Sequence, residues 1–411
     1  MKRIFITAFV LFITTITFAQ EKATFGIKFT GFVKSDIYYD SRQTVSVREG
    51  QFNLYPMIEN LDTYGKDING KDNFNILSIQ TRLTGAITGP DAFGAKTSAV
   101  IEGAFFGHTE GDINGFRLRH AYAKLNWENT ELLVGQTWHA MFITECFPGT
   151  VSFNTGAPFQ PFSRNPQIRL TQKADDFKFI FSAMTQRDFS STGPAGGSSQ
   201  YLRNSTLPEL NFTIKYHKIN SNGNEFLIGA GADYLSLTPR IITPAGYATS
   251  ESVNSLSFMA FMKVKADNIT WKLEGVIGQN TTHLTMLGGY AETDIIDPIT
   301  GDLEYTPIKT LSVWTELHTN GKEFQAGVFA GYTKNNGFDK NLEGGIYSRG
   351  SNIDYVYRVA PRLIFNSGKM RFAGEIEYTV AAYGDVQSDL AVTNTDTVGN
   401  LRFLLGVYYF F

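Results

Sequence analysis

The sequence predicts an all-β protein, a transmembrane antiparallel β-barrel of about 16 strands with short periplasmic turns and long extracellular loops. Three observations support this prediction. Apolar and polar residues alternate with a period of two, the connections alternate between short and long, and the chain ends on an aromatic strand. This combination is typical of a barrel whose outer face meets lipid and whose inner face meets water.

The first 19 residues are expected to be a secretory signal peptide. Lys2 and Arg3 form a positively charged start, residues 4–18 are apolar, and Thr17-Phe18-Ala19 resembles a cleavage site. Without Lys2 and Arg3, the chain carries 34 basic and 39 acidic side chains and has no basic tract, so nucleic acid is not an expected partner. Residues 20–411 are then expected to form the outer-membrane β-barrel.

The strands are predicted from the alternation of apolar and polar residues, which gives each strand one apolar and one polar face. In the first strand, Phe29 and Val33 share one face, whereas Lys28 and Lys34 share the other. Comparable segments start near residues 25, 74, 95, 115, 130, 166, 177, 208, 225, 252, 268, 308, 323, 352, 369 and 400. The single cysteine, Cys146, excludes an internal disulfide framework, and its expected place is a buried one.

The connections between these strands sort by length. The short ones are rich in Asn, Asp and Gly, as in Trp127-Glu-Asn-Thr130 and Asn366-Ser-Gly-Lys369, and suit tight hairpins. The long ones, such as 42–73 and 189–207, are polar and rich in Gly, Asn and Ser. Seven short turns and eight long loops place both termini at the short-turn side, as in an even-stranded outer-membrane barrel.

The last strand explains why the chain ends on Tyr-Tyr-Phe-Phe. Leu401, Phe403 and Leu405 are expected to face lipid, whereas Arg402 and Leu404 are expected to face the lumen. A terminal Phe after aromatic alternation resembles the signal that the outer-membrane assembly machinery reads. We therefore expect this barrel-assembly machinery, outer-membrane lipid and lipopolysaccharide as partners, in the outer membrane of a Gram-negative bacterium.

The polar face of the strands is net basic. Rings of Arg and Lys are how pores favour anions, and a narrow channel concentrates the field of its wall. Arg117 and Arg119 lie two apart on one strand and are the best candidates for an anion ladder; the alternative is that such arginines pair with Glu102, Glu375 and Glu377. The basic lumen residues are Lys34, Arg82, Arg117, Arg119, Arg169, Lys178, Lys215, Lys263, Lys272, Arg358, Arg362, Arg371 and Arg402.

One long loop differs from the others. Residues 139–165 contain many Phe and Pro residues and a single acidic residue, Glu145, between Phe142 and Phe162. A loop so rich in Phe needs shelter from water. We expect it to fold into the barrel and constrict the pore, with Glu145 facing the basic wall; the alternative is an external loop packed on a neighbouring subunit.

Four stretches resemble DcaP-like porins. They are Gly31-Phe-Val-Lys-Ser-Asp-Ile-Tyr-Tyr-Asp-Ser-Arg42, Arg117-Leu-Arg-His-Ala-Tyr-Ala-Lys-Leu125, Leu132-Leu-Val-Gly-Gln-Thr-Trp-His-Ala-Met-Phe142 and Asn165-Pro-Gln-Ile-Arg-Leu170. The resemblance implies a homotrimer that passes small, mainly anionic solutes, including dicarboxylates, by passive diffusion. It also implies that Arg117, Arg119 and Arg169 line the pore, with Gln136 and Trp138 beside the constriction. Some members carry an N-terminal helical extension, whereas the first strand here is expected to start within a few residues of the cleavage site.

Other functions find less support in the sequence. The six His residues show no metal-ligand spacing, no nucleophile elbow is present, and no cofactor motif occurs in a fitting context, so an enzyme is not expected. Surface loops with Asp67, Asn69 and Asp72, or Glu110, Asp112 and Asn114, leave a Ca²⁺ site open as an alternative to solvated turns. A structural or adaptor barrel with a closed pore, and a sugar channel that uses Trp138 and Trp314, are the remaining alternatives.

Overall fold

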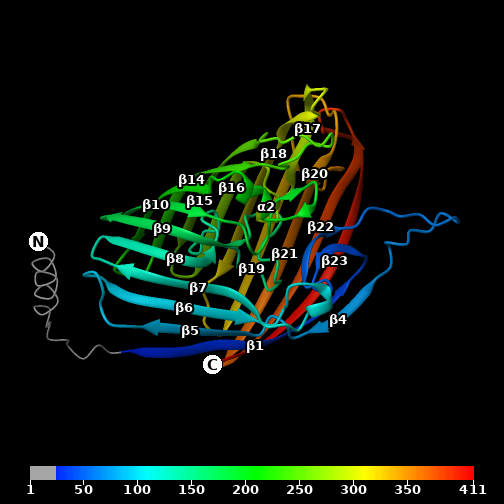
Figure 1. The fold of residues 1–411 in the computed structure, drawn as a ribbon. Helices are drawn as coiled ribbons and strands as arrows, with labels where there is room; N and C mark the ends of the chain where they lie inside the picture. The colour runs from blue at the N-terminus through cyan, green and yellow to red at the C-terminus, as the bar shows by residue number, and fades with distance from the viewer. Residues whose placement is uncertain (1–24) are drawn as a thin grey trace, which may run out of the picture.

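The computed structural model describes residues 25–411, which form a closed antiparallel barrel (Figure 1). The barrel closes because β1 (Gly26–Asp40) pairs with β5 (Arg82–Thr88) on one side and with β23 (Val392–Phe410) on the other. The predicted signal peptide, residues 1–19, lies outside the described residues. Within the described residues, no helix has the length and apolar character needed to cross a membrane.

The predicted sixteen-stranded wall is confirmed. Its second strand is interrupted at residues 78–81, so that β4 (Asn73–Leu77) and β5 are its two halves. The predicted starts agree closely with the observed ones, except that β18 and β23 begin earlier because both strands extend beyond the barrel rim. The other strands of the wall are β6 (Lys96–Ala104), β7 (Arg117–Asn126), β8 (Thr130–Trp138), β9 (Arg164–Ala174), β10 (Phe177–Met184), β13 (Glu209–Ile219), β14 (Glu225–Leu237), β15 (Val253–Lys265), β16 (Ile269–Gln279), β18 (Asp302–Thr319), β19 (Phe324–Asn335), β21 (Ile353–Ser367) and β22 (Met370–Val386).

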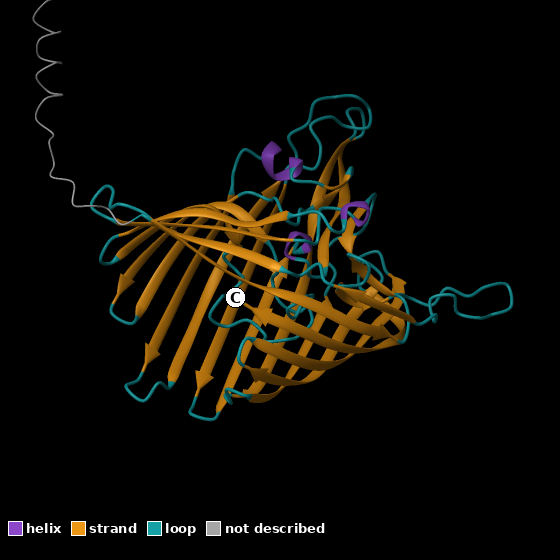
Figure 2. Ribbon diagram, turned by 90° about the horizontal axis from the view of Figure 1, so that it is seen from below, coloured by secondary structure: helices purple, strands orange, loops and turns teal. Residues whose placement is uncertain are grey.

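The two ends of the barrel differ, as the sequence predicts. Tight turns join the strands at one end, whereas the loops and all the short extra elements lie at the other (Figure 2). The upper half of β18 pairs with β17 and extends the wall outward into a projecting sheet (Figure 1). The extra elements are β2 (Thr44–Val47), β3 (Phe52–Pro56), η1 (Glu110–Asp112), β11 (Thr192–Gly193), β12 (Gly196–Gly197), α2 (Gln200–Asn204), η2 (Thr282–Leu284), β17 (Gly288–Asp297) and β20 (Ile346–Arg349).

Side chains alternate between the outer surface and the lumen along the strands. Phe29 and Val33 of β1 are exposed on the outside, whereas Lys34 is buried. In β23, Phe403 is 46% exposed and Leu405 is 41% exposed, while the intervening Leu404 is 6% exposed. The predicted faces of the first and last strands are therefore confirmed. An apolar outer surface of this kind, on strands that pair with their neighbours around a closed barrel, is what a strand-built protein needs in a bilayer.

The main hydrophobic core lies inside the barrel. It brings together inward-facing residues of the wall, such as Trp314 and Phe329, and residues of the long loops, such as Phe52, Phe106 and Phe162. A soluble sandwich would place its core between two sheets. Here the core forms where long loops fold back against the inner face of the wall, and it brings the polar groups of the lumen close together.

Candidate functional site

Residues 139–163, the inner loop, connect β8 to β9 and lie within the barrel. The ammonium group of Lys34 in β1 donates a hydrogen bond to the Val151 carbonyl at 3.0 Å. Glu375 in β22 accepts hydrogen bonds from the backbone N–H groups of Val151 and Ser152 at 2.8 and 2.9 Å. Residues 164 and 165, which the predicted loop included, already belong to β9.

A second set of contacts fastens the inner loop to β18 and β21. The Arg358 guanidinium donates to the carbonyls of Ala157 and Leu54 at 2.9 and 2.7 Å. Glu316 accepts the backbone N–H of Gly149 at 3.0 Å and forms an ion pair with Arg362. Lys34, Arg358 and Arg362 are at most 5% exposed, so these predicted pore-lining residues hold the loop and present little surface to an aqueous path.

Glu145 tethers the opposite side of the inner loop. Its carboxylate pairs with the ammonium group of Lys215 in β13 at 2.7 Å. Burial by itself would raise the pKa of Glu145, but the charge of Lys215 and its hydrogen bond bring that pKa down to about 2. The neighbouring Cys146 is buried, and its thiol lies 3.3 Å from the Met262 carbonyl. Burial raises the pKa of this thiol to about 12, which leaves it unreactive.

Arginines crowd around Phe106 near the start of the inner loop. The guanidinium groups of Arg117, Arg119 and Arg164 lie 5.6, 5.6 and 6.0 Å from the centroid of the Phe106 ring. Arg164 also lies 4.9 Å from the ring centroid of Trp138, which stacks on Phe142 at 3.9 Å. Such contacts place cations over aromatic faces in a region from which water is largely excluded.

Acidic partners balance only part of this positive charge. Glu102 pairs with Arg119 at 2.7 Å and with Arg82 at 3.4 Å. Asp188 pairs with Arg164 at 2.6 Å and also with Arg117. Burial would raise the pKa of Asp188, yet Arg164 and Arg117 hold it below its usual range. Four guanidinium groups therefore share two carboxylates.

Some guanidinium nitrogens in this arginine cluster have no hydrogen-bond acceptor. They include Nη1 of Arg119 and both Nε and Nη1 of Arg164, none of which has an acceptor among residues 25–411. Both side chains are 1% exposed. Buried, unpaired donors on positive groups are costly, and an anion would satisfy them. Arg164 escaped the sequence prediction because it is the first residue after the loop, where the alternation of the strand has not begun.

The remaining predicted residues lie in or beside this cluster. Arg82, Gln136, Trp138 and Arg169 are half-buried. Arg169 donates to the Trp138 carbonyl at 2.8 Å, and Gln136 donates to the Arg119 carbonyl at 3.2 Å. The fold thus gathers Arg82, Arg117, Arg119, Gln136, Trp138 and Arg169 on one wall, away from Arg358 and Arg362.

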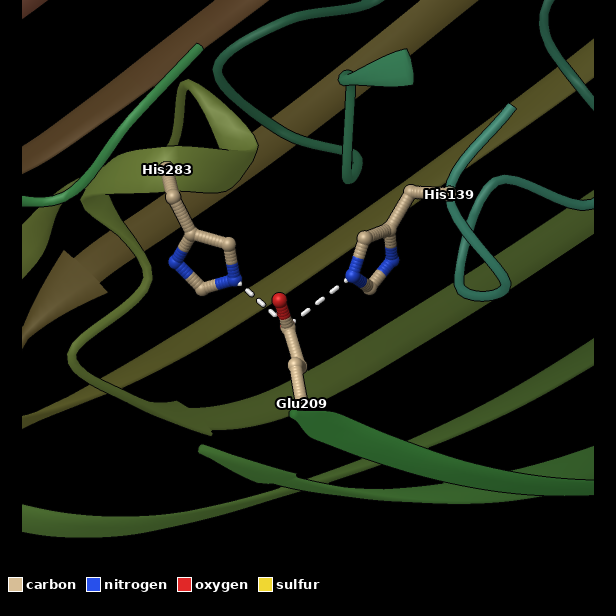
Figure 3. A group of neighbouring side chains, drawn as sticks. All are labelled: His139, Glu209 and His283. Carbon is tan, nitrogen blue, oxygen red and sulfur yellow. Dashed lines mark hydrogen bonds and ion pairs between the residues drawn. The ribbon is translucent and has the colours of Figure 1, made fainter. Parts of the chain in front are cut away.

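A buried group of two histidines and one glutamate was not predicted. His139 follows β8, His283 belongs to η2, and Glu209 begins β13, yet their side chains converge (Figure 3). The Nε2 atoms of His139 and His283 lie 2.9 and 2.8 Å from the same oxygen, Oε1 of Glu209. The three residues are 144 positions apart at the extremes, so their sequence spacing carries no signal.

The hydrogen bonds of this group favour a structural role over a metal site. In this role, called the clamp, Glu209 accepts from His139 and His283 and holds both in place. Nδ1 of His139 accepts the backbone N–H of Met141 at 3.1 Å, so in a neutral ring the proton sits on Nε2, which then donates to Glu209. Burial lowers the pKa of His139, which favours the neutral ring. A ligating histidine normally shows the reverse pattern, with its remote N–H donating and its near nitrogen free to bind. The clamp instead ties the inner loop and η2 to the wall.

Comparisons with known proteins agree on the fold. No family model and no curated protein matches the sequence. The crystal structure of the outer membrane channel DcaP of Acinetobacter baumannii matches with a TM-score of 0.68 and 17% identity, over 94% of this chain and 97% of that one. An anion-selective porin from Comamonas acidovorans matches with a TM-score of 0.55 and 10% identity, over 94% and 100%. OmpT of Vibrio cholerae in its trimer form matches with the same TM-score, identity and coverage. The chain has the fold of outer-membrane porins.

Proposed function

We propose that this protein is a passive diffusion channel of the outer membrane that prefers small anionic solutes, including dicarboxylates, and works as a homotrimer. The porin fold supports a channel in general. The preference for anions depends on a single observation, the excess of guanidinium groups in the arginine cluster over its carboxylates. No catalytic role is proposed.

The inner loop supports a selective rather than a wide channel. It is held at the wall by Lys34, Glu375, Glu316, Arg358 and Lys215, which belong to five different strands. A solute must therefore pass beside the loop, along the wall of β5 to β10, where Arg82 and Arg169 retain exposed surface. Positive groups along a narrow, low-dielectric passage raise the local concentration of anions.

One observation favours a second candidate function. The inner loop and the other long loops pack Phe52, Phe106, Phe153, Phe159 and Phe162 into one buried cluster inside the barrel. Such packing is also what a closed barrel would need. A structural or adaptor barrel, whose external loops bind partners and whose pore stays shut, is therefore the alternative.

Reversal potentials in planar bilayers under a KCl gradient test the proposal. Arg82 and Arg169 are accessible basic residues of this wall, so Arg82→Ser/Arg169→Ser should reduce the preference for anions while the barrel still inserts. Lys322→Ser provides a control, because it removes an exposed positive charge from the short turn between β18 and β19. It should leave the reversal potential unchanged.

The same recordings separate the two candidates. A trimeric channel should close in three steps of equal size. Folded protein that inserts but carries no current would support the closed barrel instead. Unchanged selectivity in the double variant, with open channels, would place these guanidinium groups outside the ion path.

A further inference from the structure

The outer surface of the barrel carries an apolar groove over β9, β10 and β13. The groove encloses about 470 Å³, and the side chains that line it include Ile168, Leu170, Phe181, Leu210 and Phe212. These residues face away from the lumen on neighbouring strands, at the level where a barrel meets hydrocarbon.

A second hollow continues the groove toward the external loops. It encloses about 410 Å³ and contains Pro166, Thr185 and Pro208, each two positions from a groove residue on the same strand or its extension. Its far side is formed by residues of the 185–208 loop, including Arg187, Leu202 and Arg203. The two hollows therefore lie next to each other along the same strands, and together they are called the trough, which runs from the apolar band to the external rim.

The external end of the trough is positively charged. Arg187 and Arg203 are exposed, and no acidic residue lines the hollow. Neither side chain has a hydrogen bond or an ion pair within residues 25–411. The nearest carboxylate in sequence, Asp188, has a side chain that is 1% exposed and is already shared by Arg117 and Arg164. Two guanidinium groups at the external end of the trough thus lack a counter-charge.

We propose that this trough binds a phosphorylated glycolipid of the outer leaflet. An acyl chain lies in the apolar groove, and a phosphate of the headgroup lies between Arg187 and Arg203. Guanidinium groups suit phosphate because they donate two parallel hydrogen bonds. Apolar area below and positive charge above match an amphiphile with a negative headgroup, and each part alone would be a weaker site. The binding does not depend on whether the pore conducts.

Purified full-length protein in an uncharged detergent provides the test, with native mass spectrometry to count bound lipid during titration. The probes are lipid A with its phosphates, dephosphorylated lipid A, and inorganic phosphate. We expect one lipid A per trough, and Arg187→Gln/Arg203→Gln should weaken its binding at least about tenfold. Ala183→Trp should also weaken binding, because Ala183 lines the groove and the larger ring would fill it.

Lys66→Gln is the matched control, since Lys66 is an exposed basic residue of another external loop. It should bind lipid A as the wild type does. Heat-modifiable migration in gels shows that each variant has folded. Equal binding of dephosphorylated lipid A, or wild-type affinity in both the double arginine variant and Ala183→Trp, would overturn the proposal. If inorganic phosphate competed fully with lipid A, the trough would be a site for free anions, and that result would also overturn the proposal.

Discussion

Glu209 is a single buried carboxylate that fixes two loops inside the barrel. It lies at the first position of β13, where the chain enters the barrel from the 185–208 loop, and it accepts from two histidines that come from two other loops. A charged acceptor strengthens both hydrogen bonds, and its burial makes the loss of either donor costly. The inner loop is therefore fixed at its start, next to Trp138 and the arginine cluster.

Substitution of Glu209 tests this clamp at the scale of one residue. Glu209→Gln removes the charge and gives the two histidine donors a weaker acceptor, so unfolding should become easier by about 1–3 kcal/mol. Thermal unfolding in detergent measures the change. Glu59→Gln, at an exposed loop position, is the control. If Zn²⁺ raised the melting temperature of the wild type and not that of Glu209→Gln, the group would be a metal site and the clamp interpretation would be wrong.

At the scale of one element, the inner loop lies inside the barrel and is bound to its wall. A 25-residue segment without regular structure is unusual inside a compact fold, and it is stable here because its backbone groups find partners on the wall. Glu316, Glu375 and Arg358 bind its backbone directly. Their charges are also engaged on the wall, since Glu316 forms ion pairs with Arg362 and Lys272. The loop explains why much of the basic lining is not free to meet solutes.

The Glu145 tether makes the inner loop sensitive to acid. The pKa of Glu145 is lowered from 4.5 to about 2 in the folded protein, so the tether stabilises the folded loop above about pH 4.5 and is lost as the pH falls toward 2. Current noise from loop motion should therefore increase between these pH values. Glu145→Gln should show that noise already at neutral pH and respond less to acid. Noise that is identical in the two proteins at every pH would rule out this role of Glu145.

At the scale of the whole molecule, the barrel separates two solvents. The outer face of Leu405 meets hydrocarbon, while Ala86, on the inner face of β5, is exposed to water at the short-turn end of the lumen. The same substitution should therefore have different consequences at the two positions. Leu405→Arg should reduce the free energy of unfolding in lipid vesicles by about 2–4 kcal/mol, because an arginine near the bilayer centre loses its hydration.

Ala86→Arg is the matched variant for this prediction. It should change the free energy of unfolding little, because its guanidinium stays hydrated in the lumen. Denaturant titration of both proteins in the same vesicles measures the difference. Equal destabilisation by the two substitutions would contradict the assignment of the faces.

The sequence by itself determined the barrel, its strands and their two faces. The reason is local: a strand in contact with lipid on one side and water on the other must alternate, and tight turns need Asn, Asp and Gly. Sixteen segments, their order and the lipid-facing residues of β23 could all be predicted in this way. The Phe-rich loop was also visible, because its composition does not suit an exposed segment.

Only the tertiary structure decided which charges pair. Asp188 lies in an unpatterned loop, and its pairing with Arg117 and Arg164 depends on how that loop folds back. His139 and His283 come from two connections and Glu209 from the start of β13, and the three meet only after the barrel closes. Periodicity reports the solvent that a residue faces, whereas ion pairs across a lumen depend on the three-dimensional course of the loops. The inner loop also covers Arg358 and Arg362, and this contact too joins residues that lie far apart in the sequence.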